Sequence, residues 1–150
     1  MSVSVVIRTR IAVCACVLSS AGAVLTGCNE FSLDIAWRSG NYMLIEVDTR
    51  GQMYLAFDEK NGAPSALVGP TVFSIGTDDK NIVVKQHPST NEFGGFNRAV
   101  TNYFIVDRTF NSAPAERQKA VRGPLGEEEF KKLSVTQSLP PFTKTFDDLK

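Results

Sequence analysis

The sixteen residues YMLIEVDTRGQMYLAF, at positions 42–57, contain two apolar runs separated by a short polar segment. The runs, residues 42–47 and 53–57, are rich in aromatic and aliphatic side chains, which favour strands. The segment between them, residues 48–52 around Gly51, has the composition of a turn. This stretch therefore predicts a β-hairpin and indicates a fold in which strands dominate.

The segment before the hairpin alternates between apolar and polar or small residues from position 31 to position 38. A strand places successive side chains on opposite faces, so we expect a strand here with its odd-numbered side chains buried. Residues 39–41 then form a turn into the hairpin. The side chains expected to face the core are Phe31, Leu33, Ile35 and Trp37.

The chain after the hairpin contains four further segments with strand composition. Gly69 and Pro70 interrupt the first of them, and Pro70 has no N–H to donate to a sheet, which predicts a bulge or an edge strand. Polar loops and turns separate the segments. The expected strands are residues 66–75, 81–86, 100–106 and 120–122, and the expected connections are 58–65, 77–80, 87–99 and 108–119.

One helix is expected near the C-terminal end, beginning after Gly126. Three glutamates, residues 127–129, stand in its first turn, where the helix dipole stabilises acidic side chains, and lysines follow. Phe130 and Leu133 would form its buried face, and Pro140 prevents any continuation. The sequence therefore predicts an α+β, mainly β fold: one antiparallel meander sheet of six or seven strands with a single C-terminal helix.

The first 27 residues have the layout of a cleavable secretory signal. Arg8 and Arg10 give a basic start, and residues 11–24 are apolar or small apart from two serines. A membrane span needs about 20 apolar residues, and this stretch is shorter. A core helix would show an amphipathic stripe, which is missing here. We therefore expect a signal peptide over residues 1–27 and one domain over residues 28–150.

The four residues Leu25-Thr26-Gly27-Cys28 resemble the lipobox of bacterial lipoprotein precursors. In that family the Cys sulfur receives a diacylglyceryl group and a dedicated peptidase cuts just before it. The resemblance implies that Cys28 carries the lipid, palmitate-type chains included, and anchors the domain to a membrane. Asn29 after the cysteine implies an outer-membrane position facing the periplasm, if the cell is diderm.

Composition narrows the functions of the segment after residue 27. The other two cysteines, Cys14 and Cys16, belong to the expected signal, so no disulfide or thiolate metal site is expected. The signal removes two arginines and no acidic residue, leaving 14 basic against 16 acidic side chains. A near-neutral surface without a basic run argues against nucleic acid as a partner.

The second half of the chain resembles an uncharacterised family of small bacterial envelope lipoproteins, a domain of unknown function. The residues that carry the resemblance are 73–80, 84–88, 102–107, 123–125 and 127–130. Members commonly have Thr or Ser where this chain has Gly126, a departure that weakens the expected helix cap. The resemblance implies a localisation and a fold, and it implies no activity and no functional residue.

Two features of the sequence are candidates for chemical sites. His87 is the single histidine, and no metalloprotease, hydrolase-elbow, P-loop or EF-hand motif accompanies it, so a structural or solvated role is favoured over catalysis. Asp78 and Asp79 supply too few oxygens for calcium, and a turn is favoured there. We expect no catalytic residue, no metal site and no cofactor, and we interpret the protein as a non-enzyme.

The segment Glu92-Phe93-Gly94-Gly95-Phe96-Asn97 is the most unusual loop, because it holds two large apolar side chains around two glycines. Either both rings pack back onto the sheet, or they form a recognition loop. In a simple meander, the loops 58–65 and 87–99 would lie at one end of the sheet. On that assumption, a partner-binding face would contain Asn61, Phe93, Phe96 and Asn97.

Three functions remain open, in decreasing order of support. The first is an envelope lipoprotein that binds another protein, one version being an immunity-type inhibitor of a toxic effector. The second is a small-ligand-binding or sensing lipoprotein, which would need an apolar pocket between sheet and helix. The third, a hydrolase, lacks any visible pair of nucleophile and base.

Overall fold

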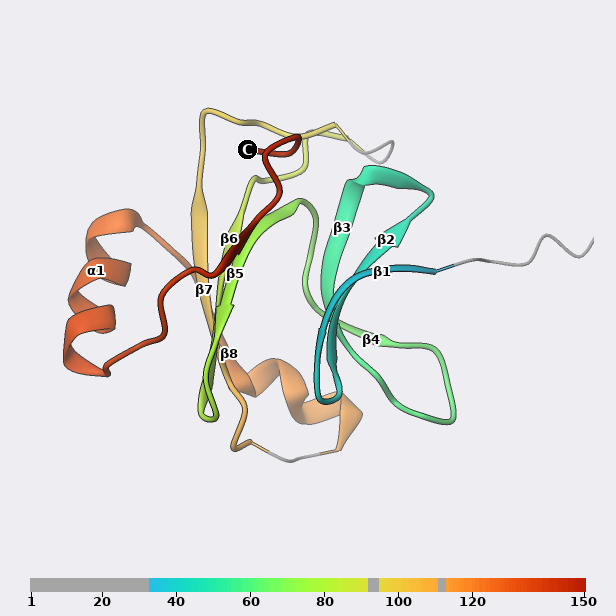
Figure 1. The fold of residues 1–150 in the computed structure, drawn as a ribbon, viewed down its shortest axis with the longest axis horizontal. Helices are drawn as coiled ribbons and strands as arrows, with labels where there is room; N and C mark the ends of the chain where they lie inside the picture. The colour runs from blue at the N-terminus through green and yellow to red at the C-terminus, as the bar shows by residue number, and fades with distance from the viewer. Residues whose placement is uncertain (1–32, 92–94, 111–112) are drawn as a thin grey trace, which may run out of the picture. The chain divides into compact units, whose positions relative to one another are not determined.

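The computed structural model describes residues 33–91, 95–110 and 113–150 (Figure 1). Their elements follow the order of the chain, with nine strands, one 3-10 helix (η1) and one α-helix. These are β1 (Asp34–Ser39), β2 (Tyr42–Val47), β3 (Thr49–Phe57), β4 (Ser65–Val68), β5 (Val72–Thr77), β6 (Asn81–Gln86), β7 (Asn102–Asp107), η1 (Pro114–Ala120), β8 (Val121–Leu125), α1 (Glu127–Thr136) and β9 (Lys144–Thr145). No helix in these three ranges is long and apolar enough to span a membrane.

The strands form two antiparallel sheets. The first sheet has the order β1-β2-β3-β4, and the second has the order β8-β7-β6-β5-β9. The predicted mainly β fold with one C-terminal helix is confirmed. The predicted single meander of six or seven strands is wrong, because the chain passes from the first sheet to the second between β4 and β5.

That passage occurs at Gly69-Pro70, where the sequence predicts a bulge or an edge strand. Since Pro70 has no N–H, it cannot continue a ladder of hydrogen bonds. The strand before it, β4, does lie at the edge of the first sheet, but β5 lies between β6 and β9. The break therefore separates two sheets instead of bending one strand.

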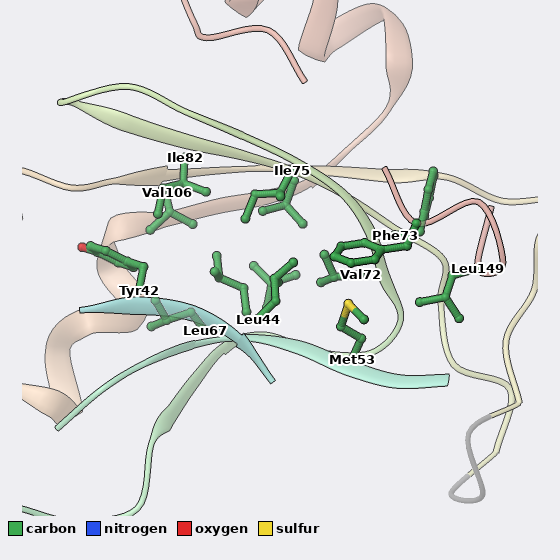
Figure 2. Close-up of a cluster of buried hydrophobic side chains, with 14 residues drawn as sticks. Tyr42, Leu44, Met53, Leu67, Val72, Phe73, Ile75, Ile82, Val106 and Leu149 are labelled. Carbon is green, nitrogen blue, oxygen red and sulfur yellow. The ribbon is translucent and has the colours of Figure 1, made fainter. Parts of the chain in front are cut away.

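The main hydrophobic core fills the space between the two sheets. Leu44, Met53 and Leu55 of the first sheet have no exposed surface, and neither do Ile75 and Val84 of the second. Figure 2 shows Leu44 and Met53 of the first sheet facing Ile75 of the second across the core. Burial of this apolar surface is the main force that holds the sheets together.

The second sheet is buried on both faces, which explains the continuous apolar run in β6. Ile82 and Val84 point into the core between the sheets, whereas Val83 points to the opposite face. There α1 covers the sheet, with Phe130 stacked 4.8 Å from Tyr103 between ring centroids. The predicted helix is confirmed from Glu127, with Gly126 as its N-cap, and Phe130 is buried as expected while Leu133 is partly buried.

The expected alternation in the first strand is only partly correct. Leu33 and Ile35 are 36% and 44% exposed, although the alternation predicts that both are buried. A register shift between Ile35 and Trp37 changes the phase of β1, so that Ala36 and Trp37 both pack against the core. Phe31 lies outside the described residues.

Three smaller expectations also need correction. The predicted turn at 48–52 is shorter, because only Asp48, at φ 58°, lies between β2 and β3, and residues 50–52 form a bulge of β3 where the register with β2 shifts. The predicted loop 108–119 contains η1, whose Gln118 donates to the carbonyl of Ala66 at 2.8 Å and so covers the edge of β4. The short β9, which pairs with β5, has no counterpart among the expected strands.

Candidate functional site

The structure separates the residues that sequence reasoning places on one binding face. Asn61 follows the end of β3 at Phe57, where loop residue Glu59 pairs with Arg117 of η1. The loop 87–99 lies near Gly51 at the other end of β3, because Thr71, paired with His87, donates to the carbonyl of Gly51. The six-residue step along β3 from Gly51 to Phe57 spans about 20 Å, so the two loops lie at opposite ends of this strand. Asn61 therefore lies far from Phe96 and Asn97, and the assumed meander geometry is wrong.

Phe96 packs back onto the second sheet. Its ring is stacked on that of His87, with centroids 6.0 Å apart and an interplanar angle of 8°. It is partly buried against the main core, and the Arg98 guanidinium lies 5.1 Å from its centroid on another side. Asn97 is exposed, and its side chain accepts the N–H of Ala99 at 3.0 Å. Phe93 lies outside the described residues.

His87 is buried, with 3% of its surface exposed. Its ring lies between Phe96 and Phe73, the latter 4.2 Å away between centroids, and its Nδ1 is 2.7 Å from the carbonyl oxygen of Val100. Its Nε2 has no hydrogen-bond partner among the described residues. These contacts fit the structural role favoured from sequence, since the ring fixes the start and the end of the loop.

The pair Asp78 and Asp79 forms the turn between β5 and β6. One oxygen of Asp78 accepts the N–H groups of Lys80 and Asn81, at 2.8 and 2.7 Å. This is the usual way in which aspartate stabilises a turn, and it uses the side chain that calcium would need. Within the described ranges, no group of three His, Cys, Asp or Glu side chains could hold a metal ion.

A cleft lies where the two sheets meet at the end opposite the loop 87–99, the lower end in Figure 1. Its volume is about 320 Å³ and it is open to solvent. The β1–β2 turn and the facing ends of β2 and β3 form one wall, and the β5–β6 turn and the end of β7 form the other. We call it the sheet-end cleft; its lining residues are Asn41, Tyr42, Phe57, Asp79, Arg108 and Phe110.

Arg108 is held in place by the turn that it faces. Its backbone N–H donates to the carbonyl of Lys80 at 2.8 Å, and its Nη1 donates to Thr77 Oγ1 at 2.9 Å and to the carbonyl of Asp78 at 2.5 Å. These bonds use one of the three nitrogens of the guanidinium group. A fixed guanidinium at the wall of a cleft is suited to bind a carboxylate, because it presents paired N–H donors.

The opposite wall is aromatic. Tyr42 and Phe57 are in edge-to-face contact at 5.1 Å, and the Arg108 guanidinium lies 5.6 Å from the centroid of Tyr42. Tyr42 lies at one end of the core, and its hydroxyl points away from the cluster (Figure 2). Burial raises the pKa of this hydroxyl above its ordinary value of 10.0, and the charges of Arg108 and Arg117 partly oppose the rise. Tyr42 is therefore a neutral donor or acceptor at physiological pH.

Phe110 completes the cleft at its outer edge and is 36% exposed. Aromatic and arginine side chains in an exposed hollow are the composition that dominates protein-binding hot spots. Asp79 adds a negative charge on the same wall as Arg108. The cleft can therefore bind a carboxylate and an apolar group together.

A second hollow, of about 300 Å³, lies on the other side of the β5–β6 turn. Its walls are this turn and the two residues that follow α1. Asp79 lines both hollows. We call this one the turn hollow; its lining residues are Asp78, Asp79, Lys80, Asn81, Gln137 and Ser138.

Sequence reasoning missed the sheet-end cleft. Its residues come from both sheets, and a single meander sheet would not have brought Tyr42 and Arg108 together. One indication is present in the sequence: Phe110 is a large apolar residue at the start of a polar loop, two positions after Arg108 and three after the end of β7.

Comparison with known proteins adds one relationship. No curated protein and no solved structure matches the chain. The family model described as "Protein of unknown function (DUF3997)" matches residues 39–142, which include β2 to β8, α1 and every residue of both hollows. This match covers more than two thirds of the chain and extends well beyond the second half, where the sequence resemblance was noted. The chain therefore belongs to this family of proteins of unknown function.

Proposed function

We propose that the mature protein is a lipid-anchored protein of the bacterial envelope that binds a second protein through the sheet-end cleft. The observation that carries the binding proposal is the composition of the cleft, in which Tyr42, Phe57 and Phe110 surround the fixed guanidinium of Arg108. Buried aromatic side chains and arginine supply most of the binding energy in protein interfaces. A non-enzymatic role is part of this proposal.

The anchoring part rests on the sequence Leu25-Thr26-Gly27-Cys28 after a signal-like segment. Two or more acyl chains on Cys28 would attach the protein stably to a membrane, whereas one chain binds only marginally. Cys28 precedes the first residue of β1, Asp34, by six positions, which span at most about 20 Å. That tether would hold the start of β1 close to the membrane surface, on the periplasmic side of the outer membrane in a diderm cell, and the cleft, beside Asn41 and Tyr42, would lie at the other end of β1.

An immunity-type inhibitor is one form of this proposal, since such a protein would block an effector at the envelope by direct binding. A small-ligand-binding lipoprotein is the second candidate. The volume of the sheet-end cleft, about 320 Å³, falls at the lower limit of small-molecule sites, which favours that candidate in size. Its open, mixed polar and aromatic lining favours a protein surface instead.

Cross-linking in intact cells separates the two candidates. A photoreactive amino acid replaces Phe110 at the edge of the cleft or, as the matched control, Val135, which is 81% exposed on α1. A protein partner in the cleft predicts one discrete cross-linked protein from position 110 and none from position 135. Equal patterns at the two positions, or no product from position 110, would contradict the proposal and favour small-ligand screening.

The anchor has its own test. Metabolic labelling with a palmitate analogue should mark the wild-type chain and leave the Cys28→Ser variant unlabelled. The unlabelled variant should also stay uncleaved or be lost from the outer-membrane fraction. Cys14→Ser is the matched control, because that residue lies in the segment expected to be removed. Equal labelling of wild type and Cys28→Ser would refute lipidation at this position.

A further inference from the structure

The two hollows lie on either side of a single turn. The sheet-end cleft, of about 320 Å³, and the turn hollow, of about 300 Å³, are both lined by Asp79. The turn between them, residues 78–80, is exposed but rigidly built, since Asp78 caps it and Arg108 holds it from the side. A ligand that crosses this turn would therefore occupy both hollows without displacing a mobile element.

The charges on the two sides of the turn differ. In the sheet-end cleft, Arg108 provides one positive charge and Asp79 one negative charge. In the turn hollow, Asp78 and Asp79 provide two negative charges against the one positive charge of Lys80. The first hollow can therefore pair with a carboxylate, whereas the second favours a basic group.

We infer that the partner is recognised through an extended segment that crosses the β5–β6 turn, with a carboxylate bound by Arg108 and a basic side chain in the turn hollow. This inference rests on the proposed function and names the chemistry of its partner. Two hollows of about 320 and 300 Å³ accept single side chains, whereas a whole helix is about 10 Å across. An extended chain turns alternate side chains to the same face, so two of them can enter hollows that share Asp79 as a wall.

A synthetic peptide array tests the inference on the full chain, purified in detergent. A first array holds random octapeptides, and a second array holds each octapeptide that binds together with its two halves. We expect bound octapeptides to share an Asp or Glu and, a few positions away, a Lys or Arg. Replacing the acidic residue by its amide should weaken binding about tenfold or more, as for a charged hydrogen bond that is lost. The separate halves should bind far more weakly than the whole.

Variants of the protein locate the contact. R108Q should remove the dependence on the acidic residue of the peptide, whereas R122Q, which changes an exposed arginine on β8, should leave the affinity within about twofold. Because R108Q also loosens the β5–β6 turn, F110D serves as a second variant at an exposed position of the cleft. F110D should weaken binding too, with V135D on α1 as its control.

The inference is overturned if no octapeptide binds the wild-type chain, if half-peptides bind as tightly as whole ones, or if neither R108Q nor F110D weakens binding. A cross-linked partner from position 110 without any bound peptide would leave the proposed function standing and would show that a folded surface is recognised. Failure of both experiments would reject the function and the inference together.

Discussion

Gly76 of β5 lies directly beneath the carbonyl of Pro141, so close that a Cβ built on Gly76 would be 1.9 Å from the Pro141 oxygen. This approach lets the chain after α1 run along β5, where Thr143 donates to the carbonyl of Ile75 at 3.0 Å and β9 begins. The absence of a side chain at Gly76 is therefore what allows the C-terminal segment to complete the second sheet.

Gly76→Ala should destabilise the protein by about 2–3 kcal/mol, because the added methyl group meets backbone atoms that cannot move without breaking β9 from β5. Urea denaturation followed by circular dichroism measures this change. Gly62→Ala is the control, since nothing lies within 4 Å of its added Cβ, and it should change the free energy of unfolding by less than about 0.5 kcal/mol. Equal effects of the two substitutions would contradict this description of the packing.

Arg117 connects η1 to the first sheet. It pairs with Glu59, and its guanidinium lies 3.7 Å from the centroid of Phe57, while the Arg117 and Glu59 side chains are only 12% and 16% exposed. Arg117→Met should cost about 2–4 kcal/mol of unfolding free energy, because it leaves the Glu59 carboxylate largely buried without its partner. Chemical denaturation measures the loss.

The matched control for this prediction is Lys119→Met, which breaks a pair between exposed side chains, Lys119 and Glu116. Exposed pairs contribute little, so the effect should be below about 1 kcal/mol. A loss for Arg117→Met no larger than that for Lys119→Met would mean that the contact with Glu59 does not hold η1 in place.

The sequence makes Phe96 a candidate for partner binding, whereas the structure packs its ring against His87. Phe96→Ser should therefore lower the free energy of unfolding by about 1–3 kcal/mol, since it removes a partly buried ring from the edge of the core. Asn97→Ser, at the exposed neighbouring position, should lower it by less than about 0.5 kcal/mol. If Phe96→Ser leaves the thermal stability unchanged, the ring is not part of the core and Phe96 is again a candidate for partner binding.

The carboxyl group of Asp148 should make stability depend on acidity. Its hydrogen bonds to Arg50, at 2.7 and 3.3 Å, lower its pKa below the ordinary value of 3.8. A lowered pKa in the folded state contributes stability that is present above pH 4 and is lost as the pH falls below it. The melting temperature should therefore decline on acidification, and Asp148→Asn should make this decline smaller.

Arg50→Gln removes the same ion pair from the other side, together with the pair between Arg50 and Glu46, and should also flatten the acid decline. The double variant should add little to Arg50→Gln, since that single variant already removes the partner of Asp148. Thermal unfolding from pH 7 to pH 3 measures all three variants. If the melting temperature of Asp148→Asn falls with pH as steeply as that of the wild type, this carboxyl group is not a source of the acid sensitivity.

The local elements of the fold were largely predictable from sequence. The strands β2, β3, β6 and β7 and the helix α1 are each indicated by apolar runs, alternation or dipole-compatible charges. The division into two sheets was not predictable in this way, because a strand that is buried on both faces, such as β6, does not show which sheet its neighbours join. Two-residue β9 carries no pattern at all, and it forms only because Gly76 admits the chain.

The candidate site was harder to predict than the fold, because it depends on the packing of two sheets that the sequence pattern does not separate. Tyr42 lies in the first sheet and Arg108, 66 positions later, directly follows β7 of the second, so the two meet only because the sheets pack face to face. Sequence reasoning searched for function in the loop with two phenylalanines, where His87 turns out to anchor Phe96. Arg108 looked like the start of an ordinary polar loop.

The claim that the sheet-end cleft binds a protein partner is tested most directly by calorimetric titration of the cross-linked partner into three forms of the full chain: wild type, R108Q and R122Q. We expect R108Q to weaken binding about tenfold or more, because a fixed guanidinium in the interface is lost, and R122Q to bind within about twofold of wild type. Equal affinities of wild type and R108Q, with both proteins folded, would contradict the claim.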